Sequence, residues 1–283
     1  MIATDRPFRS VLYIPGSKPR ALEKARTLAV DAIIFDLEDA VAPDEKIAAR
    51  DTLAAALATG GYGPRYRIVR VNGADTPWGG DDLASAATMA PDAVLLPKVG
   101  HPDDIAAAAR ALPDGTAIWA MMESPAGILD AAAIARAADG LVLGTNDLAK
   151  DIGSRDAADR APLVTALQTC VLAARAAGIP CIDGVYNAFK DEDGLRAECE
   201  QGRAFGMDGK TLIHPAQVAV ANAAFAPTEA EADLARCQIA AFDAAMAEGQ
   251  GVAVLDGRIV ENLHVDTARR TLAKLDAIAA LEG

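Results

Sequence analysis

Residues 117–147, AIWAMMESPAGILDAAAIARAADGLVLGTND, hold the pattern that decides the fold. Two short apolar runs flank an alanine-rich, helix-like stretch, and each run ends in a carboxylate, Glu123 in the first and Asp147 in the second. Apolar runs of this length that are rich in aliphatic residues are typical of strands buried on both faces. An acid at the end of such a strand packs poorly. It is well placed to bind a hard cation such as Mg²⁺, which takes one or two carboxylates and keeps several waters.

Similar strand-like runs recur along the rest of the chain and bring the total to eight. They are RSVLYIP (9–15), DAIIFDLED (31–39), RYRIVRVN (65–72), DAVLLPK (92–98), IPCIDGVY (179–186) and DGKTLIHP (208–215). Helix-like segments separate them, and several of these begin with Pro or Asp and end with Gly. This alternation predicts a parallel (β/α)8 TIM barrel over residues 1–226. A doubly wound open sheet is the alternative. Such a sheet usually has a glycine-rich G-x-G-x-x-G turn after its first strand, and PGSKP at 15–19 does not match that motif.

The pattern changes after about residue 226. Residues 227–249 predict a helix outside the alternation, and VAVLDGRIVE at 252–261 predicts a hairpin with Asp256 and Gly257 at its turn. A last helix with one apolar face follows. We therefore expect a C-terminal helical and hairpin extension over 227–283, which covers the active site of its own or a neighbouring subunit.

Composition narrows the classes of function. The chain has 283 residues, a net charge of −13 and only 4% aromatic residues, which disfavours binding to nucleic acid. No apolar run is long enough to span a bilayer, so we expect no membrane association. The N-terminal MIATDRPFRS lacks the apolar region of a signal peptide, and the four cysteines fit no zinc pattern. We expect a cytoplasmic protein with reduced thiols.

The active site of such a barrel lies where the carboxyl ends of the strands meet. Polar side chains follow every predicted strand. They are Lys18 and Arg20 after the first, Asp36, Glu38 and Asp39 at the second, Arg70 and Asn72 at the third, Lys98, Glu123, Asp147, Asp183 and His214 at the others. A mouth rich in acids with a few bases suits a metal site for an anionic substrate. Lone acids after strands are also common helix caps, and His214 also fits a buried structural role.

The acids of the second strand need compensation. Three carboxylates within four positions at a buried strand end are costly unless a cation or hydrogen bonds offset them. Arg70 lies within the apolar run VRVN and must also be paired. It is either a salt-bridge partner of these acids or a group that binds a substrate oxyanion, and both interpretations stay open.

The motifs in this order resemble the citrate lyase beta subunit and malyl-CoA lyase family. The resemblance runs from about residue 9 to 225 and rests on RSVLYIPGSKPR, FDLEDAVAPDEK, VRVNG, LLPKV, MMESPAGI, GTNDLAK, IDGVYNAFKD and GMDGKTLIHPAQV. It implies a Mg²⁺-dependent barrel acting on an acyl-CoA thioester together with a small 2-keto or hydroxy acid.

The resemblance also implies roles for individual residues. Glu123 and Asp147 would be the metal ligands and would hold the substrate with Arg70. Glu38 and Asp39 would hold metal-bound waters and Arg70. The candidates for the phosphates of CoA are Arg9, Lys18 and Lys24.

One position departs from the family pattern. The family has an aspartate in its C-terminal segment that reaches a neighbouring subunit's site as acid or base, and here Glu261 occupies that position. One extra methylene displaces the carboxylate and can change the rate or the reaction. Glu261 could act as such a base, or it could be an exposed glutamate before the last helix. A tail that completes a neighbour's site makes a homotrimer or homohexamer the expected assembly.

The first functional hypothesis is a carbon–carbon lyase. It would cleave or form a 3-hydroxyacyl-CoA of the malyl-CoA, β-methylmalyl-CoA or citramalyl-CoA type and give an acyl-CoA and a 2-keto acid such as glyoxylate. Two alternatives remain on the same scaffold. One is a malyl-CoA-type thioesterase, with Glu261 activating water. The other is a citrate lyase beta subunit that is active only in a larger complex.

Overall fold

The computed structural model describes residues 6–155 and 159–282, and eight parallel strands form its centre. The strands are β1 (Ser10–Pro15), β2 (Ala32–Asp36), β3 (Tyr66–Arg70), β4 (Ala93–Leu96), β5 (Ala117–Met122), β6 (Gly140–Leu143), β7 (Cys181–Asp183) and β8 (Gly209–Leu212). Each strand pairs with the next in sequence, and β8 pairs with β1, which closes the barrel. The predicted TIM barrel is confirmed, and closure rules out the open doubly wound sheet.

Alternate residues of each strand pack on the two sides of the barrel wall. Val11, Ile34 and Ile68 belong to an inner cluster, whereas Leu12 and Ile33 belong to a larger cluster between the strands and the helices. Most strand residues are apolar because both faces are buried, as expected for a parallel sheet. The inner positions near the carboxyl ends of the strands are the ones that can reach a ligand.

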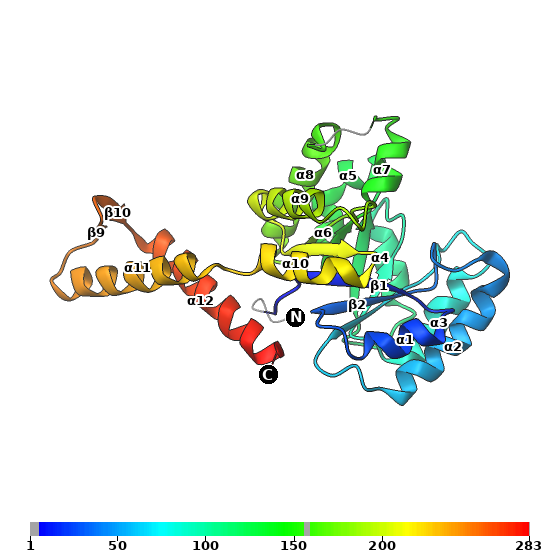
Figure 1. The fold of residues 1–283 in the computed structure, drawn as a ribbon. Helices are drawn as coiled ribbons and strands as arrows, with labels where there is room; N and C mark the ends of the chain where they lie inside the picture. Colours follow the sequence, from blue (N-terminus) through cyan, green and yellow to red (C-terminus); the bar gives the residue numbers. More distant parts are fainter. Residues whose placement is uncertain (1–5, 156–158, 283) are drawn as a thin grey trace. The chain divides into compact units, whose positions relative to one another are not determined.

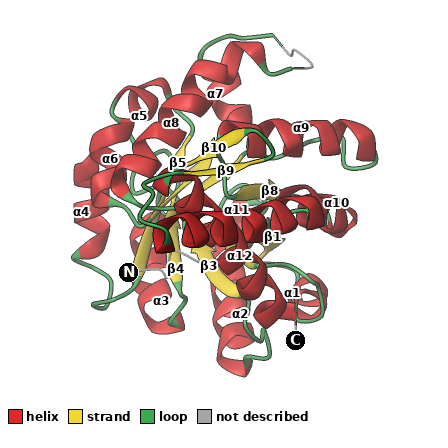
Figure 2. Cartoon of the chain, turned by 90° about the vertical axis from the view of Figure 1, so that its left-hand side faces the viewer, coloured by secondary structure: helices red, strands yellow, loops and turns green. Residues whose placement is uncertain are grey.

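Helices surround the strands (Figure 2). They are α1 (Pro19–Ala25), α2 (Lys46–Thr59), α3 (Gly79–Met89), α4 (Pro102–Ala109), α5 (Pro125–Leu129), α6 (Ala131–Ala137), α7 (Thr145–Asp151), α8 (Val164–Ala177), α9 (Glu192–Phe205) and α10 (Val218–Phe225). Short 3₁₀ turns precede three of them, at Pro43–Glu45, Ala161–Leu163 and Pro215–Gln217. Ser124 caps α5 by accepting a hydrogen bond from the backbone of Gly127, so the neighbouring Glu123 is not used as a cap.

The described residues divide into two compact units, one of residues 8–225 and one of residues 226–282 together with Arg6 and Pro7. In the C-terminal unit, α11 (Glu229–Ala247) and α12 (Asn262–Glu282) lie side by side, and the hairpin of β9 (Ala253–Leu255) and β10 (Arg258–Val260) joins them (Figure 1). Asp256 and Gly257 form the hairpin turn with φ of 50° and 75°. This is the geometry that Asp-Gly favours in a two-residue hairpin loop, so the predicted hairpin is confirmed.

Within the described part of the chain, no helix has the length and apolar character needed to cross a membrane.

Candidate active site

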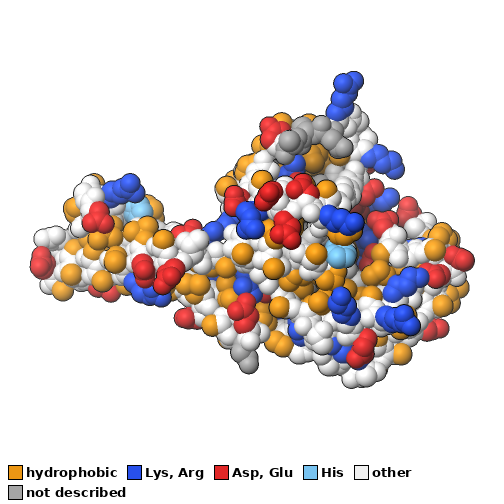
Figure 3. All heavy atoms as spheres, viewed as in Figure 1, with side chains coloured by type: hydrophobic (Ala, Val, Ile, Leu, Met, Phe, Trp, Pro, Cys, Tyr) orange, Lys and Arg blue, Asp and Glu red, His pale blue; other side chains and the backbone are white. Residues whose placement is uncertain are grey.

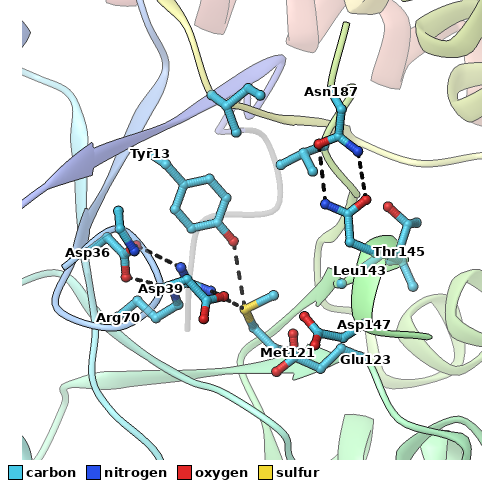
Figure 4. Close-up of a pocket in the computed structure, with 15 residues that line it drawn as sticks. Tyr13, Asp36, Asp39, Arg70, Met121, Glu123, Leu143, Thr145, Asp147 and Asn187 are labelled. Atoms are coloured by element: carbon cyan, nitrogen blue, oxygen red, sulfur yellow. Dashed lines mark hydrogen bonds and ion pairs between the residues drawn. The ribbon is translucent and has the colours of Figure 1, made fainter. Parts of the chain in front are cut away.

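A cavity of about 290 Å³ opens where the carboxyl ends of the strands meet (Figure 4). It is lined by Tyr13, Asp36, Asp39, Ala40, Arg70, Met121, Glu123, Leu143, Gly144, Thr145, Asn146, Asp147, Val185, Asn187 and Ile213. These residues come from both ends of the barrel sequence, so the site depends on closure of the whole barrel. Four of the lining side chains are carboxylates and one is a guanidinium, which leaves an excess of negative charge.

Arg70 is held by the acids of the second strand. It lies beside Asp36 in the register of β2 and β3, and Nε and Nη2 donate to the two carboxylate oxygens of Asp36 at 2.7 Å each. Nη1 lies 2.7 Å from Glu38 Oε2 and 3.3 Å from Asp39 Oδ2. The structure therefore shows Arg70 as a salt-bridge partner of these acids, which is the first of the two interpretations of the sequence. The ion pairs keep Arg70 protonated and fix Nη1 beside the cavity.

Glu38 is the least satisfied of these acids. Its Oε2 is buried and, despite the short approach to Arg70, accepts no hydrogen bond from any described residue. Burial raises the pKa of Glu38 to about 7, with Arg70 opposing the shift and Asp39 adding to it. Lys46 donates to the backbone oxygens of Leu37 and Glu38 at 3.0 and 2.9 Å and so holds this loop in place.

Glu123 and Asp147 lie next to each other on the wall of the cavity (Figure 4). Glu123 follows β5 and is buried, and its Oε1 accepts a hydrogen bond from the backbone N–H of Lys98 at 2.7 Å. Asp147 lies in the first turn of α7. Burial raises the pKa of Glu123, and the nearby negative charge of Asp147 adds to this shift.

Gly144, the glycine before α7, allows the backbone that carries Asp147 to lie close to Glu123. A Cβ atom at Gly144 would lie 2.3 Å from Glu123 Cβ and 2.5 Å from Glu123 Oε2. Any larger residue would push Glu123 out of its position. The motif GTND thus combines a close backbone approach with a carboxylate three residues later.

The pair of carboxylates fits a magnesium ion. In the described ranges, no group of three or more His, Cys, Asp or Glu side chains is arranged to bind a metal. Mg²⁺ commonly uses only one or two carboxylates together with waters and substrate oxygens, so Glu123 and Asp147 suffice. The excess of negative charge in the lining is what a cation would neutralise.

The structure does not bring the three predicted phosphate-binding residues to this cavity. Arg9 precedes β1 at the opposite end of the barrel, where its Nε and Nη2 donate to Asp31 at 3.0 and 2.8 Å. Lys18 is exposed and forms an ion pair with Glu45 at 3.2 Å, and Lys24 is exposed in the last turn of α1. The role of these cations in binding CoA stays a prediction, and for Arg9 the buried pair with Asp31 argues against it.

Two other residues at predicted strand ends also lie outside the lining. Asp183 is fully buried and accepts hydrogen bonds from Arg160 at 2.7 Å and from Lys210 at 3.1 Å, so it is neither a helix cap nor a site residue. His214 is exposed and caps the 3₁₀ turn Pro215–Gln217 through its imidazole, instead of being buried in the core.

Glu261 lies in the C-terminal unit, immediately before α12. Its side chain is exposed, and its backbone N–H donates to His264 Nδ1 at 3.1 Å. Within the described ranges, no hydrogen bond or ion pair engages the Glu261 carboxylate. A free carboxylate agrees with both interpretations of the sequence, a base and an exposed glutamate.

Sequence reasoning missed Tyr13 and the pair of Asn146 and Asn187. The side chain of Tyr13 points inward from β1. The alternation of side chains along RSVLYIP could have predicted this, because every second side chain of a strand points into the barrel. The two asparagines bond each other twice, at 3.2 and 2.9 Å, across the rim. That pairing joins the first turn of α7 to the loop after β7, and no sequence pattern predicts it.

Comparisons with known proteins bear directly on this site. A family model described as HpcH/HpaI aldolase/citrate lyase matches residues 9–215. The chain is 63% identical over 276 residues to a Cereibacter sphaeroides protein named (3S)-malyl-CoA thioesterase, with 97% of this chain and 96% of the relative covered. It is 34% identical over 284 residues to the citrate lyase subunit beta of Escherichia coli, with 96% and 94% covered. A crystal structure of CitE from Mycobacterium tuberculosis with magnesium, acetoacetate and coenzyme A aligns with a TM-score of 0.81 at 29% identity, covering 95% of this chain and 98% of that one.

These relatives confirm the resemblance and correct the first functional hypothesis. The expectation of a carbon–carbon lyase is wrong, because relatives at 63% identity over nearly the whole chain are named as thioesterases. The motifs could not decide this point. They place Arg70 and the two carboxylates predicted to bind a metal, and such a site can serve both reactions. Which reaction occurs depends on what attacks the substrate.

Proposed function

The chain belongs to the HpcH/HpaI aldolase/citrate lyase family, and from this premise we propose that it hydrolyses the thioester of a malyl-CoA-type substrate with the help of Mg²⁺. The products would be a hydroxy dicarboxylic acid and free CoA. The observation that carries the proposal is the near full-length identity of 63% to proteins named (3S)-malyl-CoA thioesterase. The acidic cavity with one fixed guanidinium supports it.

Glu123 and Asp147 would hold the metal. Both line the cavity, and Lys98 and Gly144 fix Glu123 from two sides. A bound divalent cation would polarise substrate oxygens and offset the charge of the substrate carboxylate. The CitE structures with magnesium support this choice of ion.

Arg70 would orient the acyl group. Asp36 occupies Nε and Nη2, so the guanidinium cannot swing, and Nη1 remains beside the cavity. A prepositioned donor of this kind stabilises negative charge that develops on a substrate oxygen without reorganising during the reaction. Glu38 and Asp39 would hold Arg70 and nearby waters.

Water is the proposed nucleophile. The described lining contains no serine, cysteine or histidine, so it lacks the pairs that usually form acyl-enzymes. The base would be Glu261, whose exposed carboxylate is free to accept a proton from water.

We further propose that the C-terminal unit covers the site of a neighbouring subunit in a cytoplasmic homotrimer or homohexamer. The hairpin exposes Val254 and Ile259, which are directly opposite each other in register, and Leu263 follows them; they are 68%, 60% and 60% exposed. Figure 3 shows one face of this unit, on which hydrophobic side chains lie between charged ones. Exposed apolar groups beside Glu261 suit a contact that delivers this carboxylate to a partner. Light scattering of the purified protein tests the assembly.

The reaction is tested with the purified chain, malyl-CoA and Mg²⁺. We expect malate and a free thiol in equal amounts, which a thiol reagent detects, and no glyoxylate. Excess EDTA should stop thiol release, and added Mg²⁺ should restore it. Release of glyoxylate without free thiol, or no turnover, would contradict the proposal.

A further inference from the structure

Tyr13 lines the cavity and carries a polar group that the proposed reaction has not yet used. It points inward from β1, and its hydroxyl faces the cavity (Figure 4). The hydroxyl donates to Met121 Sδ at 3.7 Å, and no other hydrogen bond is made by this group within the described ranges. A thioether is a weak acceptor, so a strong donor is left with a poor partner inside a polar cavity.

A second donor converges on the same sulfur. Arg70 Nη1 lies 3.6 Å from Met121 Sδ, so a phenol and a guanidinium point at one weak acceptor. The Arg70 guanidinium also lies over the Tyr13 ring, 4.8 Å from its centroid, and keeps the ring in place. Burial raises the pKa of the Tyr13 hydroxyl above its usual value, so the proton needed for donation is present at neutral pH.

We infer that Tyr13 is a catalytic residue whose hydroxyl, together with Arg70 Nη1, binds the carbonyl oxygen of the substrate thioester. This assignment rests on the proposed hydrolysis. An incoming carbonyl oxygen is a far better acceptor than Met121 Sδ, and both donors already point to the region beside this sulfur. Two fixed donors that meet at one point are the arrangement that stabilises an oxyanion in acyl transfer.

The step that these donors assist is the attack of water on the thioester. The water oxygen forms a bond to the carbonyl carbon, a base takes one of its protons, and the carbonyl electrons move to the oxygen held by Tyr13 and Arg70. The carbonyl then re-forms as the carbon–sulfur bond breaks. The CoA thiolate leaves with that electron pair and takes up the proton from the base.

Tyr13→Phe tests the assignment because it removes the hydroxyl and keeps the ring beneath Arg70. We expect the kcat for thiol release to fall 100-fold or more, the cost of losing one oxyanion donor, with KM for malyl-CoA changed by less than about threefold. Tyr62→Phe is the matched control. Tyr62 also lies beneath an arginine, Arg26 at 5.4 Å, and donates to the backbone of Leu22, outside the cavity. It should keep wild-type turnover.

A thioether analogue of malyl-CoA, in which CH₂ replaces the thioester carbonyl, tests whether the Tyr13 hydroxyl binds the carbonyl oxygen. It should bind wild type and Tyr13→Phe equally in calorimetry with Mg²⁺ present. Weaker binding of the analogue to Tyr13→Phe would overturn the assignment, because the hydroxyl would then serve another group of the substrate. An unchanged kcat would also overturn it. If the wild type itself releases no thiol, the proposed function fails, and that result is distinct from either outcome for Tyr13.

Discussion

Lys98 donates its backbone N–H to Glu123 Oε1 at 2.7 Å from a left-handed conformation, with φ of 52°. Such a φ is uncommon for a residue other than glycine, and strain of this kind tends to persist where the surrounding structure requires it. The Lys98 side chain is exposed, so the backbone, and not the ammonium, contacts the proposed metal ligand. The strained peptide fixes one oxygen of Glu123 and leaves the other facing Asp147.

The first prediction separates the backbone of Lys98 from its side chain. Lys98→Val should weaken Mg²⁺ binding about 10- to 100-fold, because a β-branched residue resists positive φ and the donor to Glu123 would move. Lys98→Gly and Lys98→Ala should keep the affinity within about threefold. Calorimetric titration with Mg²⁺ measures this. Equal losses in all three variants would mean that the ammonium matters instead.

The second prediction concerns the carboxylate pair. Glu123→Gln or Asp147→Asn should lower thiol release at least 100-fold and weaken Mg²⁺ binding, because an amide lacks the charge that offsets a cation. Both variants should retain the circular dichroism of the wild type. Glu192→Gln, an exposed acid in the first turn of α9, is the control and should behave as wild type. Wild-type turnover in either site variant would refute the metal assignment.

The third prediction compares two arginine–aspartate pairs. Asp36→Asn leaves the buried Arg70 without its main partner and should lower the free energy of unfolding by about 3–5 kcal/mol. The pair of Arg67 and Asp92 has the same forked geometry but is 32% and 33% exposed, so Asp92→Asn should cost only about 1 kcal/mol. Urea unfolding in EDTA measures both. Similar losses would show that burial does not control the contribution of these pairs.

The fourth prediction follows from the raised pKa of Glu38. Between its ordinary pKa of 4.5 and its folded value of about 7, the folded state holds a proton that the unfolded state has lost. The contribution of Glu38 to the free energy of unfolding therefore falls as pH rises through this window, by on the order of 1–3 kcal/mol, and is constant above it. Urea unfolding of the metal-free protein from pH 5 to 8 should show a difference between wild type and Glu38→Gln that changes below pH 7 only. A difference independent of pH would place the pKa of Glu38 outside this window.

The barrel could be predicted from the sequence because its strands are apolar on both faces and recur with helices between them. The carboxyl ends of the strands then gave Arg70, Glu123 and Asp147, all of which line the cavity. Strand direction alone places these side chains at one mouth, since the carboxyl ends of all the strands of a parallel barrel meet there.

The partners of these residues could not be predicted. Which acid forms the two-bonded pair with Arg70 depends on the register between β2 and β3, which sets Asp36 beside it. Glu38 Oε2 is left with an ion pair to Arg70 and no hydrogen bond from a described residue. Arg9 and Lys18 are both basic residues next to β1 and were both predicted to bind the phosphates of CoA. Arg9 precedes the strand, however, so it lies at the other end of the barrel. Tyr13 was missed because an aromatic residue within an apolar run reads as core, and only its inward direction reveals its hydroxyl to the cavity.

The last prediction concerns Glu261. Glu261→Gln should lower the kcat for thiol release at least 100-fold, since an amide cannot accept a proton from water, while KM for malyl-CoA stays within about threefold. Glu261→Asp should retain part of the activity, because it keeps the carboxylate but shortens its reach by one methylene. Glu229→Gln, an exposed glutamate at the start of α11 in the same unit, controls for loss of charge and should leave turnover unchanged. If Glu261→Gln keeps the wild-type kcat, Glu261 is a surface residue, and the base that activates water must be sought among the acids of the cavity. A parallel loss in kcat and in the size of the assembly would instead assign Glu261 to subunit contact, because a base can be removed without altering the mass measured by light scattering.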